Sequence, residues 1–461
     1  MSRQGIAVWT TDVRGRVLDR LAGLEQVIPR EVVRQALAAT GRCNQRCCAL
    51  SHEVMLWVVL AMGLFTDVPI RQVFKHARRL RQGEPTPARS SLCEARQRLG
   101  GEPVAELFRR VVRPLARPDT PGAFWRGRRL MAFDSTILDA PDSDANAAAF
   151  GRSSGGRGQG AFPQVRKASL VELGTHVETA LAIGGWQDDE RELTRTLFDV
   201  IPADALVLLD RGFYSYDFWK ELDDRGAALI ARVKSQLVLR PIQSLADGSF
   251  LAKVYRNSYD RTKDRNGVVV RVIEYTLDDP QRVGHGEVHR QLTNQLDPEE
   301  LPALEWVTLY HERWEIELVY DEQKTHQDPV RPGKAAQLRS ETPAGVRQEV
   351  LALSLGHFVV RALMAEAAAA SNLAPDRLSF SGCLRILRCR LPENGGQTPM
   401  REQEWYEALL WELGQEIIEP RRNRVNPRVV KRKMSKFAKK RPEHRGCPPL
   451  MKTFAESVVI T

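Results

Sequence analysis

The stretch YHERWEIELVYDEQK, residues 310–324, carries polar and charged side chains where a helix packed on a core would carry apolar ones. Each residue of an α-helix turns by about 100°, so Arg313, Glu317 and Lys324 fall within roughly 60° of Tyr310 around the axis. An amphipathic helix ordinarily fills such a stripe with leucine or isoleucine. Because burying charged groups without partners is costly, we expect the stripe to face a polar ligand.

The other sides of the same helical wheel look more ordinary. Apolar side chains flank the stripe at Trp314, Ile316, Leu318 and Tyr320, while Glu312, Glu315 and Glu322 gather opposite it. The acidic face is therefore predicted to be exposed to solvent. The alternative interpretation of the stripe is a surface ion pair between Arg313 and Glu317, worth only about 0.2–0.5 kcal/mol.

The size and charge of the chain limit its class. With 461 residues, a formal charge of +10 and a pI of about 9.4, it has room for several domains and favours a polyanionic partner such as DNA. The seven cysteines form no even disulfide framework and the N-terminus has no apolar signal core, which predicts reduced thiols in the cytoplasm. The longest apolar run, residues 54–65, is too short to span a bilayer, so no membrane partner is expected.

Secondary-structure patterns change along the chain. Residues 1–125 are predicted to form an all-α domain, in which Ser90 or Ser91 caps a helix that carries Arg96 and Arg98. Such a helix could enter a DNA groove, although a solvated surface helix is the commoner meaning. After Trp125, short apolar strands alternate with helices, which predicts an α/β layer with a mixed sheet.

Two of these predicted strands end in an aspartate. RRLMAFD ends at Asp134 and ALVLLD ends at Asp210, and the unusual helix supplies Glu317. Three carboxylates brought together would suit two Mg²⁺ or Mn²⁺ ions, which prefer oxygen ligands. Two such ions about 3.5–4 Å apart promote in-line phosphoryl transfer without a protein nucleophile. Arg313 and Lys324, on the stripe of Glu317, would then grip phosphates, and Tyr310 could contact a phosphate or a displaced base.

The same residues resemble a known family. YHERWEIELVYDEQK fits the Y-(2)-R-(3)-E-(6)-K signature of the insertion-sequence-four family of bacterial DDE transposases. The resemblance extends to MAFDSTILDAPDSDANAAAFGR around Asp134, VLLDRGFYSYDFW around Asp210 and PRVVKRKMSKF in the tail, and covers about residues 28–440. The chain departs from the family at Ser135, where glycine is common.

This resemblance implies a ribonuclease-H-like, mixed-sheet catalytic domain with a β-rich insertion, an all-α N-terminal domain and a basic C-terminal tail. It implies that Asp134, Asp210 and Glu317 bind the two metal ions and that Tyr310, Arg313 and Lys324 contact DNA. The domains expected are an N-terminal DNA-binding domain (1–125), the first half of the catalytic domain (126–235), the insertion (236–295), the second half of the catalytic domain (296–371) and a C-terminal helical region with the tail (372–461).

The leading hypothesis is a cut-and-paste transposase in the bacterial cytoplasm, associated with the nucleoid. It would bind the terminal inverted repeats of its element, cleave them and join their 3′-OH ends to target DNA, with a homodimer expected in the DNA complex. Two alternatives stay open, which are a transposase-derived repressor without catalysis and a nuclease of the same fold that cuts without joining.

The tail, residues 421–445, carries twelve lysines and arginines against one acid, Glu443. A basic run of this kind favours contact with phosphates, with solvated disorder as the alternative. It has almost no aromatic residues, so it is predicted to add affinity for DNA without choosing its sequence.

Overall fold

The computed structural model describes residues 19–43, 49–78, 85–155, 158–280, 282, 284–329, 338–393, 399–419 and 452–461. The chain folds into two compact units. Unit 1 comprises residues 1–202 and 314–418, and unit 2 comprises residues 203–313 and 419–461. The basic tail lies outside the described residues.

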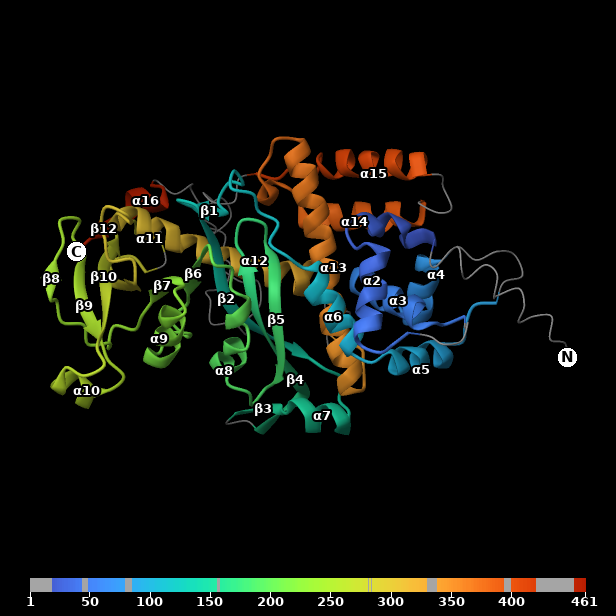
Figure 1. Cartoon of the computed structure of the whole chain (residues 1–461), viewed down its shortest axis with the longest axis horizontal. Helices are drawn as coiled ribbons and strands as arrows, with labels where there is room; N and C mark the ends of the chain where they lie inside the picture. Colours follow the sequence, from blue (N-terminus) through green and yellow to red (C-terminus); the bar gives the residue numbers. More distant parts are fainter. Residues whose placement is uncertain are drawn as a thin grey trace, which may run out of the picture. The chain divides into compact units, whose positions relative to one another are not determined.

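The N-terminal part of unit 1 is helical, as the sequence predicts. Its apolar helix α3 (His52–Leu64) begins after Ser51, whose hydroxyl accepts a hydrogen bond from the Val54 amide. Gly63 allows α3 to approach the long helix α13 closely, because a Cβ at this position would lie 1.8 Å from the Ala352 carbonyl oxygen. The other N-terminal helices are η1 (Asp19–Gln26), α2 (Arg30–Ala39), α4 (Ile70–Ala77), α5 (Arg89–Leu99) and α6 (Glu102–Val111) (Figure 1).

Helix α13 (Pro343–Ala370) is the central helix of this core. It is long and apolar enough to cross a membrane, but 89% of its apolar window is buried inside the protein, as in a core helix. It shares one hydrophobic core with the N-terminal helices and with the C-terminal helices of the unit. Those C-terminal helices are η5 (Pro375–Arg377), α14 (Phe380–Arg390), η6 (Leu391–Glu393) and α15 (Pro399–Leu413).

The strands of unit 1 pair antiparallel. Strand β2 (Arg128–Asp139) pairs with β4 (Gly158–Glu172), and β4 also pairs with β5 (Val177–Gly185) as a hairpin. Two shorter strands pair with these, β1 (Phe124–Trp125) with β2 and β3 (Arg152–Gly155) with β4. The helices of this part are α7 (Asp144–Phe150), α8 (Glu190–Arg195) and η2 (Phe198–Val200).

Unit 2 begins with a parallel pair of strands, β6 (Ala205–Leu209) and β7 (Ala228–Arg232), connected by α9 (Tyr216–Asp224). The sheet continues from β7 in the order β11, β10, β9, β8, all antiparallel. These strands confirm the β-rich insertion, with one short helix that the sequence patterns missed. The elements are β8 (Gln243–Ser244), β9 (Phe250–Val254), α10 (Ser258–Lys263), β10 (Val268–Leu277), β11 (His289–Thr293) and α11 (Ala303–His311).

The last residues of the chain also belong to unit 2. Helix α16 (Phe454–Ser457) leads into β12 (Val458–Ile460), which pairs with β10. Sequence patterns do not predict this strand, because three residues carry too little periodicity to separate a strand from a coil. The mixed α/β class, the helical N-terminal part and the inserted strands together confirm the predicted fold class.

Candidate active site

The segment that contains Tyr310, Arg313, Glu317 and Lys324 is not one regular helix. Helix α11 ends at His311, a 3₁₀ turn covers Glu312–Trp314, α12 spans Glu315–Asp321, and a π-helical stretch, η4, covers Glu322–Gln327. A 3₁₀ turn overwinds the backbone and a π-helix underwinds it, so both shift the angular positions of the side chains that follow. A helical wheel of constant 100° steps therefore fails across this segment.

The prediction of a solvated acidic face was wrong for Glu315 and Glu322. Glu322 is buried with 3% of its surface exposed, and it is hydrogen-bonded to His176, His357 and Arg361. Burial alone would raise the pKa of Glu322, but Arg361 and His176 hold it well below its ordinary value. Glu315 accepts a hydrogen bond at 2.7 Å from Nε2 of His176. The turn before β5 and helix α13 cover this face, which a wheel cannot foresee.

The first aspartate lies inside a strand and not at its end, which corrects another expectation. Strand β2 continues five residues beyond Asp134 to Asp139, because β4 pairs with it as far as Gln164. The Asp134 carboxylate accepts a hydrogen bond from the Ser135 amide at 2.8 Å. The side chain is partly exposed, so it remains open to a ligand.

Helix α12 connects Glu317 to this strand. Tyr320, three residues after Glu317, donates a hydrogen bond at 2.8 Å from its hydroxyl to the backbone oxygen of Asp134. Burial, with the Asp134 carboxylate next, raises the pKa of Tyr320 well above its ordinary value, so the hydroxyl keeps its proton. Glu317 itself is exposed. Unit 1 therefore joins the elements that carry two of the three predicted acids.

Lys324 lies on the π-helical stretch and reaches the same strand. Its Nζ donates to Oγ1 of Thr136 at 3.1 Å and to the backbone oxygen of Ile137 at 3.0 Å. Burial lowers the pKa of Lys324, although the nearby Asp139 carboxylate opposes the shift. The ammonium group thus lies beside β2 shortly after Asp134.

Unit 2 holds the third acid with the other half of the signature. Asp210 directly follows β6, as the sequence predicts, and the Tyr310 hydroxyl donates to the backbone oxygen of Leu209 at 3.1 Å. The Arg313 guanidinium lies 4.0 Å from an Asp210 carboxylate oxygen. Tyr310 and Arg313 are buried, whereas 43% of the Asp210 side chain is exposed. The buried pair therefore supports the acid and leaves its carboxylate accessible.

The donor set fits hard divalent cations. Asp134, Asp210 and Glu317 all offer partly or fully exposed carboxylate oxygens, which Mg²⁺ and Mn²⁺ prefer. Among the described residues no group of three or more histidine, cysteine, aspartate and glutamate side chains is arranged to hold a metal. The acids are divided between the two units, two in unit 1 and one in unit 2.

One of the two arginines on the helix expected to enter a DNA groove makes hydrogen bonds inside the protein. Helix α5 begins at Arg89 with Ala88 at its N-cap and no side-chain cap, so the predicted cap at Ser90 or Ser91 was wrong. Arg96 donates to Gln348, to Ser340 and to the Gly345 backbone oxygen, which fastens α5 to α13 and the residues before it. Arg98 is exposed and could still contact DNA.

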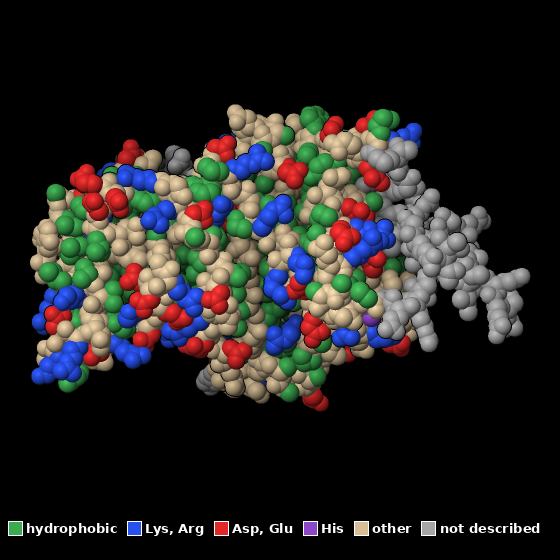
Figure 2. Space-filling view, in the orientation of Figure 1, with side chains coloured by type: hydrophobic (Ala, Val, Ile, Leu, Met, Phe, Trp, Pro, Cys, Tyr) green, Lys and Arg blue, Asp and Glu red, His purple; other side chains and the backbone are tan. Residues whose placement is uncertain are grey.

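Positive charge is concentrated outside the described residues. The chain has 68 basic and 58 acidic side chains, of which the tail holds twelve basic and one acidic. The rest of the chain therefore holds 56 basic and 57 acidic side chains. The remainder is thus close to neutral, and Figure 2 shows basic and acidic side chains interspersed over the visible face. The tail accounts for the positive charge of the chain.

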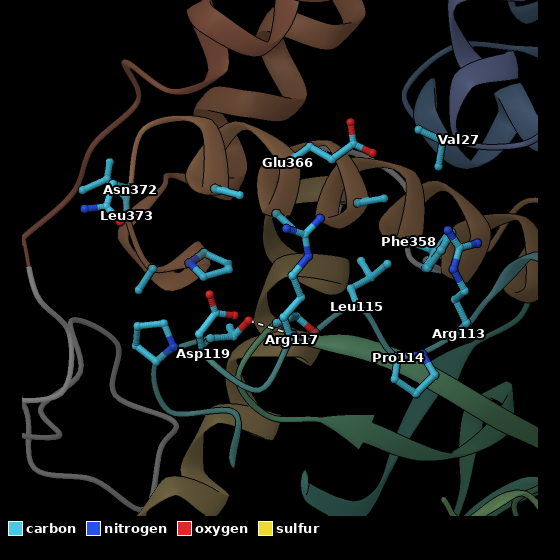
Figure 3. A pocket seen from close by; sticks show the side chains of 18 of the residues that line it. Val27, Arg113, Pro114, Leu115, Arg117, Asp119, Phe358, Glu366, Asn372 and Leu373 are labelled. Atoms are coloured by element: carbon cyan, nitrogen blue, oxygen red, sulfur yellow. Dashed lines mark hydrogen bonds between the residues drawn. The ribbon is translucent and has the colours of Figure 1, made fainter. Parts of the chain in front are cut away.

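A cavity of about 510 Å³ in unit 1 is lined by none of the predicted site residues. Its walls come from residues 113–121 and from the second half of α13, and in Figure 3 Arg117 points toward that helix. Two acids, Asp119 and Glu366, offset Arg113 and Arg117 in the lining. This balance of charge marks no preference for an anion or a cation.

Sequence reasoning missed three residues that surround Asp134. Tyr320 appeared only as a flanking aromatic side chain, and Ser135 only as a departure from the family. Glu190, at the first position of α8, accepts a hydrogen bond from the Ser135 hydroxyl. No spacing rule connects residues 135 and 190, so only the tertiary structure reveals the contact.

Comparisons with known proteins agree with the signature. The model of the insertion element 4 transposase N-terminal domain matches residues 18–109, and the transposase DDE domain matches residues 125–332. The chain is 30% identical over 426 residues to the transposase InsG for insertion sequence element IS4 of Escherichia coli, covering 90% of this chain and 93% of that protein.

Two further matches are weaker. A putative transposase, InsZ, of Escherichia coli is 27% identical over 200 residues, covering 43% of this chain and 66% of that protein. A solved piggyBac transposase synaptic complex with hairpin DNA aligns with 87% of each chain at 10% identity and a TM-score of 0.40.

Proposed function

Since the chain belongs to the IS4 family of DDE transposases, enzymes that cleave and transfer DNA, we propose that it moves its own insertion sequence by a cut-and-paste reaction. It binds the terminal inverted repeats, cleaves at the element ends and joins the freed 3′-OH ends to target DNA. The observation that carries the proposal is that one signature segment contacts both aspartate-bearing strands. Tyr310 bonds to the residue before Asp210, and Tyr320 bonds to Asp134 itself.

Asp134, Asp210 and Glu317 are proposed as the ligands of two Mg²⁺ or Mn²⁺ ions. DDE transposase domains generally depend on divalent metal, and such ions activate the attacking oxygen and stabilise the leaving one. The choice of ligands follows from donor type, since each acid is at least partly exposed and offers the carboxylate oxygen atoms that these ions prefer. The remaining residues of the signature position these acids or the DNA.

Arg313, which precedes Glu317 in the sequence, and Lys324, which follows it, are both proposed to bind phosphate groups of the DNA. Arg313, beside Asp210, offers a planar guanidinium that suits phosphate oxygens, whereas Lys324, beside β2, offers a point charge. Tyr310 is buried and bonded to Leu209, which supports a role in holding Asp210 more than direct contact with a base.

The proposed partners are the terminal repeats and the target DNA, bound by a homodimer in the cytoplasm near the nucleoid. The basic tail supplies affinity for phosphates, because it holds the net positive charge of the chain. The N-terminal helical domain is the proposed reader of the repeats, with Arg98 on α5 as one exposed basic residue.

An assay with purified protein, labelled 3′-OH element ends and a target plasmid tests this function against its two rivals. A transposase joins the labelled ends to the plasmid in the presence of Mg²⁺. A nuclease would give cuts without joints, and a repressor would give neither product while still binding the ends. Joining that persists in excess chelator would refute the metal assignment.

A further inference from the structure

The first aspartate has a neighbour on the strand that the proposed metal chemistry does not use. Consecutive residues of a β-strand point to opposite faces, so the side chains of Asp134 and Ser135 leave β2 on different sides. Ser169 on β4 is in register with Asp134, so their side chains lie on the same face of the sheet. The hydroxyl of Tyr320 on α12 lies against both residues. The Ser135 side chain therefore faces away from α12.

On the face of the sheet that carries the Ser135 side chain, the neighbouring side chains are small. Ser135 is in register with Ala168 of β4, which is in register with Ala182 of β5. These two small side chains leave room beside the Ser135 hydroxyl. Glu190 at the start of α8 uses that room and accepts the hydrogen bond of the hydroxyl.

The turn before α8 holds Glu190 in this place. Asp188 accepts a hydrogen bond at 2.6 Å from the Gly185 amide, and a Cβ on Gly184 would lie 2.4 Å from the same carboxylate oxygen. Asp189 then caps α8 by accepting from the amides of Arg191 and Glu192. Each of three consecutive acids thus has a separate contact, and only that of Glu190 leads to the proposed active site.

We propose that Glu190 is a positioning residue that orients the Asp134 carboxylate from the opposite face of the sheet through Ser135. The bond to Glu190 fixes the Ser135 residue, and the amide of Ser135 donates at 2.8 Å to the Asp134 carboxylate. Outer contacts of this kind typically change metal affinity by about 10–100-fold. The device depends on the serine of this chain, because glycine at position 135 offers no hydroxyl.

The inference rests on the proposed function of Asp134, and Mn²⁺ binding to the full chain tests both. Free Mn²⁺ is followed by electron paramagnetic resonance during titration, so the readout does not require cleavage. Glu190→Ala and Ser135→Ala are each expected to weaken Mn²⁺ binding about tenfold. The double variant is expected to be no weaker than either single variant, because both changes remove the same link.

Two matched variants separate a lost link from a lost charge. Glu190→Gln keeps a side-chain oxygen that can accept the hydrogen bond of the Ser135 hydroxyl, so this variant is expected to bind Mn²⁺ like the unaltered protein. Glu192→Ala removes an exposed acid from the same helix, one that pairs with Arg195, and is also expected to be silent. Circular dichroism of each variant verifies folding, and Ser135→Ala carries the test if Glu190→Ala fails to fold.

The outcomes distinguish the two levels of the proposal. If Asp134→Asn binds Mn²⁺ like the unaltered protein, the assignment of the metal ligand fails. If Asp134→Asn loses binding but Glu190→Ala and Ser135→Ala keep it, only the positioning role of Glu190 is overturned. Additive losses in the double variant, or equal losses in Glu190→Gln and Glu190→Ala, would likewise overturn it.

Discussion

The two ends of the signature segment are built differently. Its first end, Tyr310 and Arg313, is buried in unit 2 and contacts the last residues of β6 and Asp210. Its second end belongs to unit 1, where Glu317 is exposed while Tyr320 and Lys324 bond to β2. The boundary between the units falls between Arg313 and Trp314, within the 3₁₀ turn. The difference teaches that a signature contiguous in sequence supports two separate acid-bearing strands.

The largest expected effect comes from the exposed acid of the second end. Glu317→Gln keeps the size of the side chain and removes the charge that would hold a metal, so cleavage should fall by several orders of magnitude while binding of element ends persists. Asp321→Asn, on the same helix and also exposed, should retain activity. Cleavage rates and gel-shift affinities measure the two properties. Equal loss in both variants would show that charge on α12, and not a ligand at residue 317, is what matters.

The next effect concerns the free energy of unfolding and the buried Glu322, which lies in the second end and contacts α13. Glu322→Gln leaves Arg361, His176 and His357 without their shared carboxylate, which should cost about 3–5 kcal/mol of unfolding free energy. Thermal and urea unfolding measure the loss. Glu315→Gln should cost less, since Glu315 is partly buried, whereas Glu322 is fully buried, and Glu315 joins the cluster through His176, whose Nε2 donates to it at 2.7 Å.

The same cluster gives a pH dependence with a defined sign. The folded pKa of Glu322 lies well below its unfolded value, so its contribution to stability is complete above the unfolded pKa and is lost as pH falls through the folded pKa. Glu322→Gln should therefore flatten the decline of stability on acidification. An unchanged acid profile in the variant would contradict the charged state assigned to Glu322.

An intermediate effect is expected from the lysine of the second end. Lys324→Met keeps an apolar stem but loses the ammonium group that bonds to Thr136 and Ile137. Cleavage should fall by about 10–100-fold, as for other residues that support a metal site. Lower salt should restore part of the activity if the group also binds phosphate, because electrostatic contacts with DNA weaken as salt rises. A loss that no salt concentration alters would restrict Lys324 to supporting β2.

The smallest expected effect tests the buried first end. Tyr310→Phe removes a single hydrogen bond, to the Leu209 backbone oxygen, which should cost about 1 kcal/mol of stability. DNA affinity should stay unchanged, because the hydroxyl is buried and bonded inside unit 2. Gel shifts with element ends check this. A large loss of affinity with intact stability would return Tyr310 to the direct DNA contact that the family resemblance implied.

Local pattern determined much of this protein from the sequence alone. Strand β6 ends immediately before Asp210, as the sequence predicts, and the N-terminal part is helical, because short apolar runs and helical periodicity depend on neighbours in the chain. The spacing of Tyr310, Arg313, Glu317 and Lys324 was enough to indicate the family. Charge counting located the positive excess in the tail.

Tertiary structure decided which face of each element is covered. The partial burial of Glu315, the full burial of Glu322, the internal use of Arg96 and the continuation of β2 past Asp134 all depend on partners more than thirty residues away in sequence or on a second strand. A helical wheel assumes constant rotation and an isolated helix, whereas this segment changes from 3₁₀ to α to π geometry as it passes between units. Sequence periodicity records the residues along a helix, but the packing of distant elements sets its rotation and its neighbours.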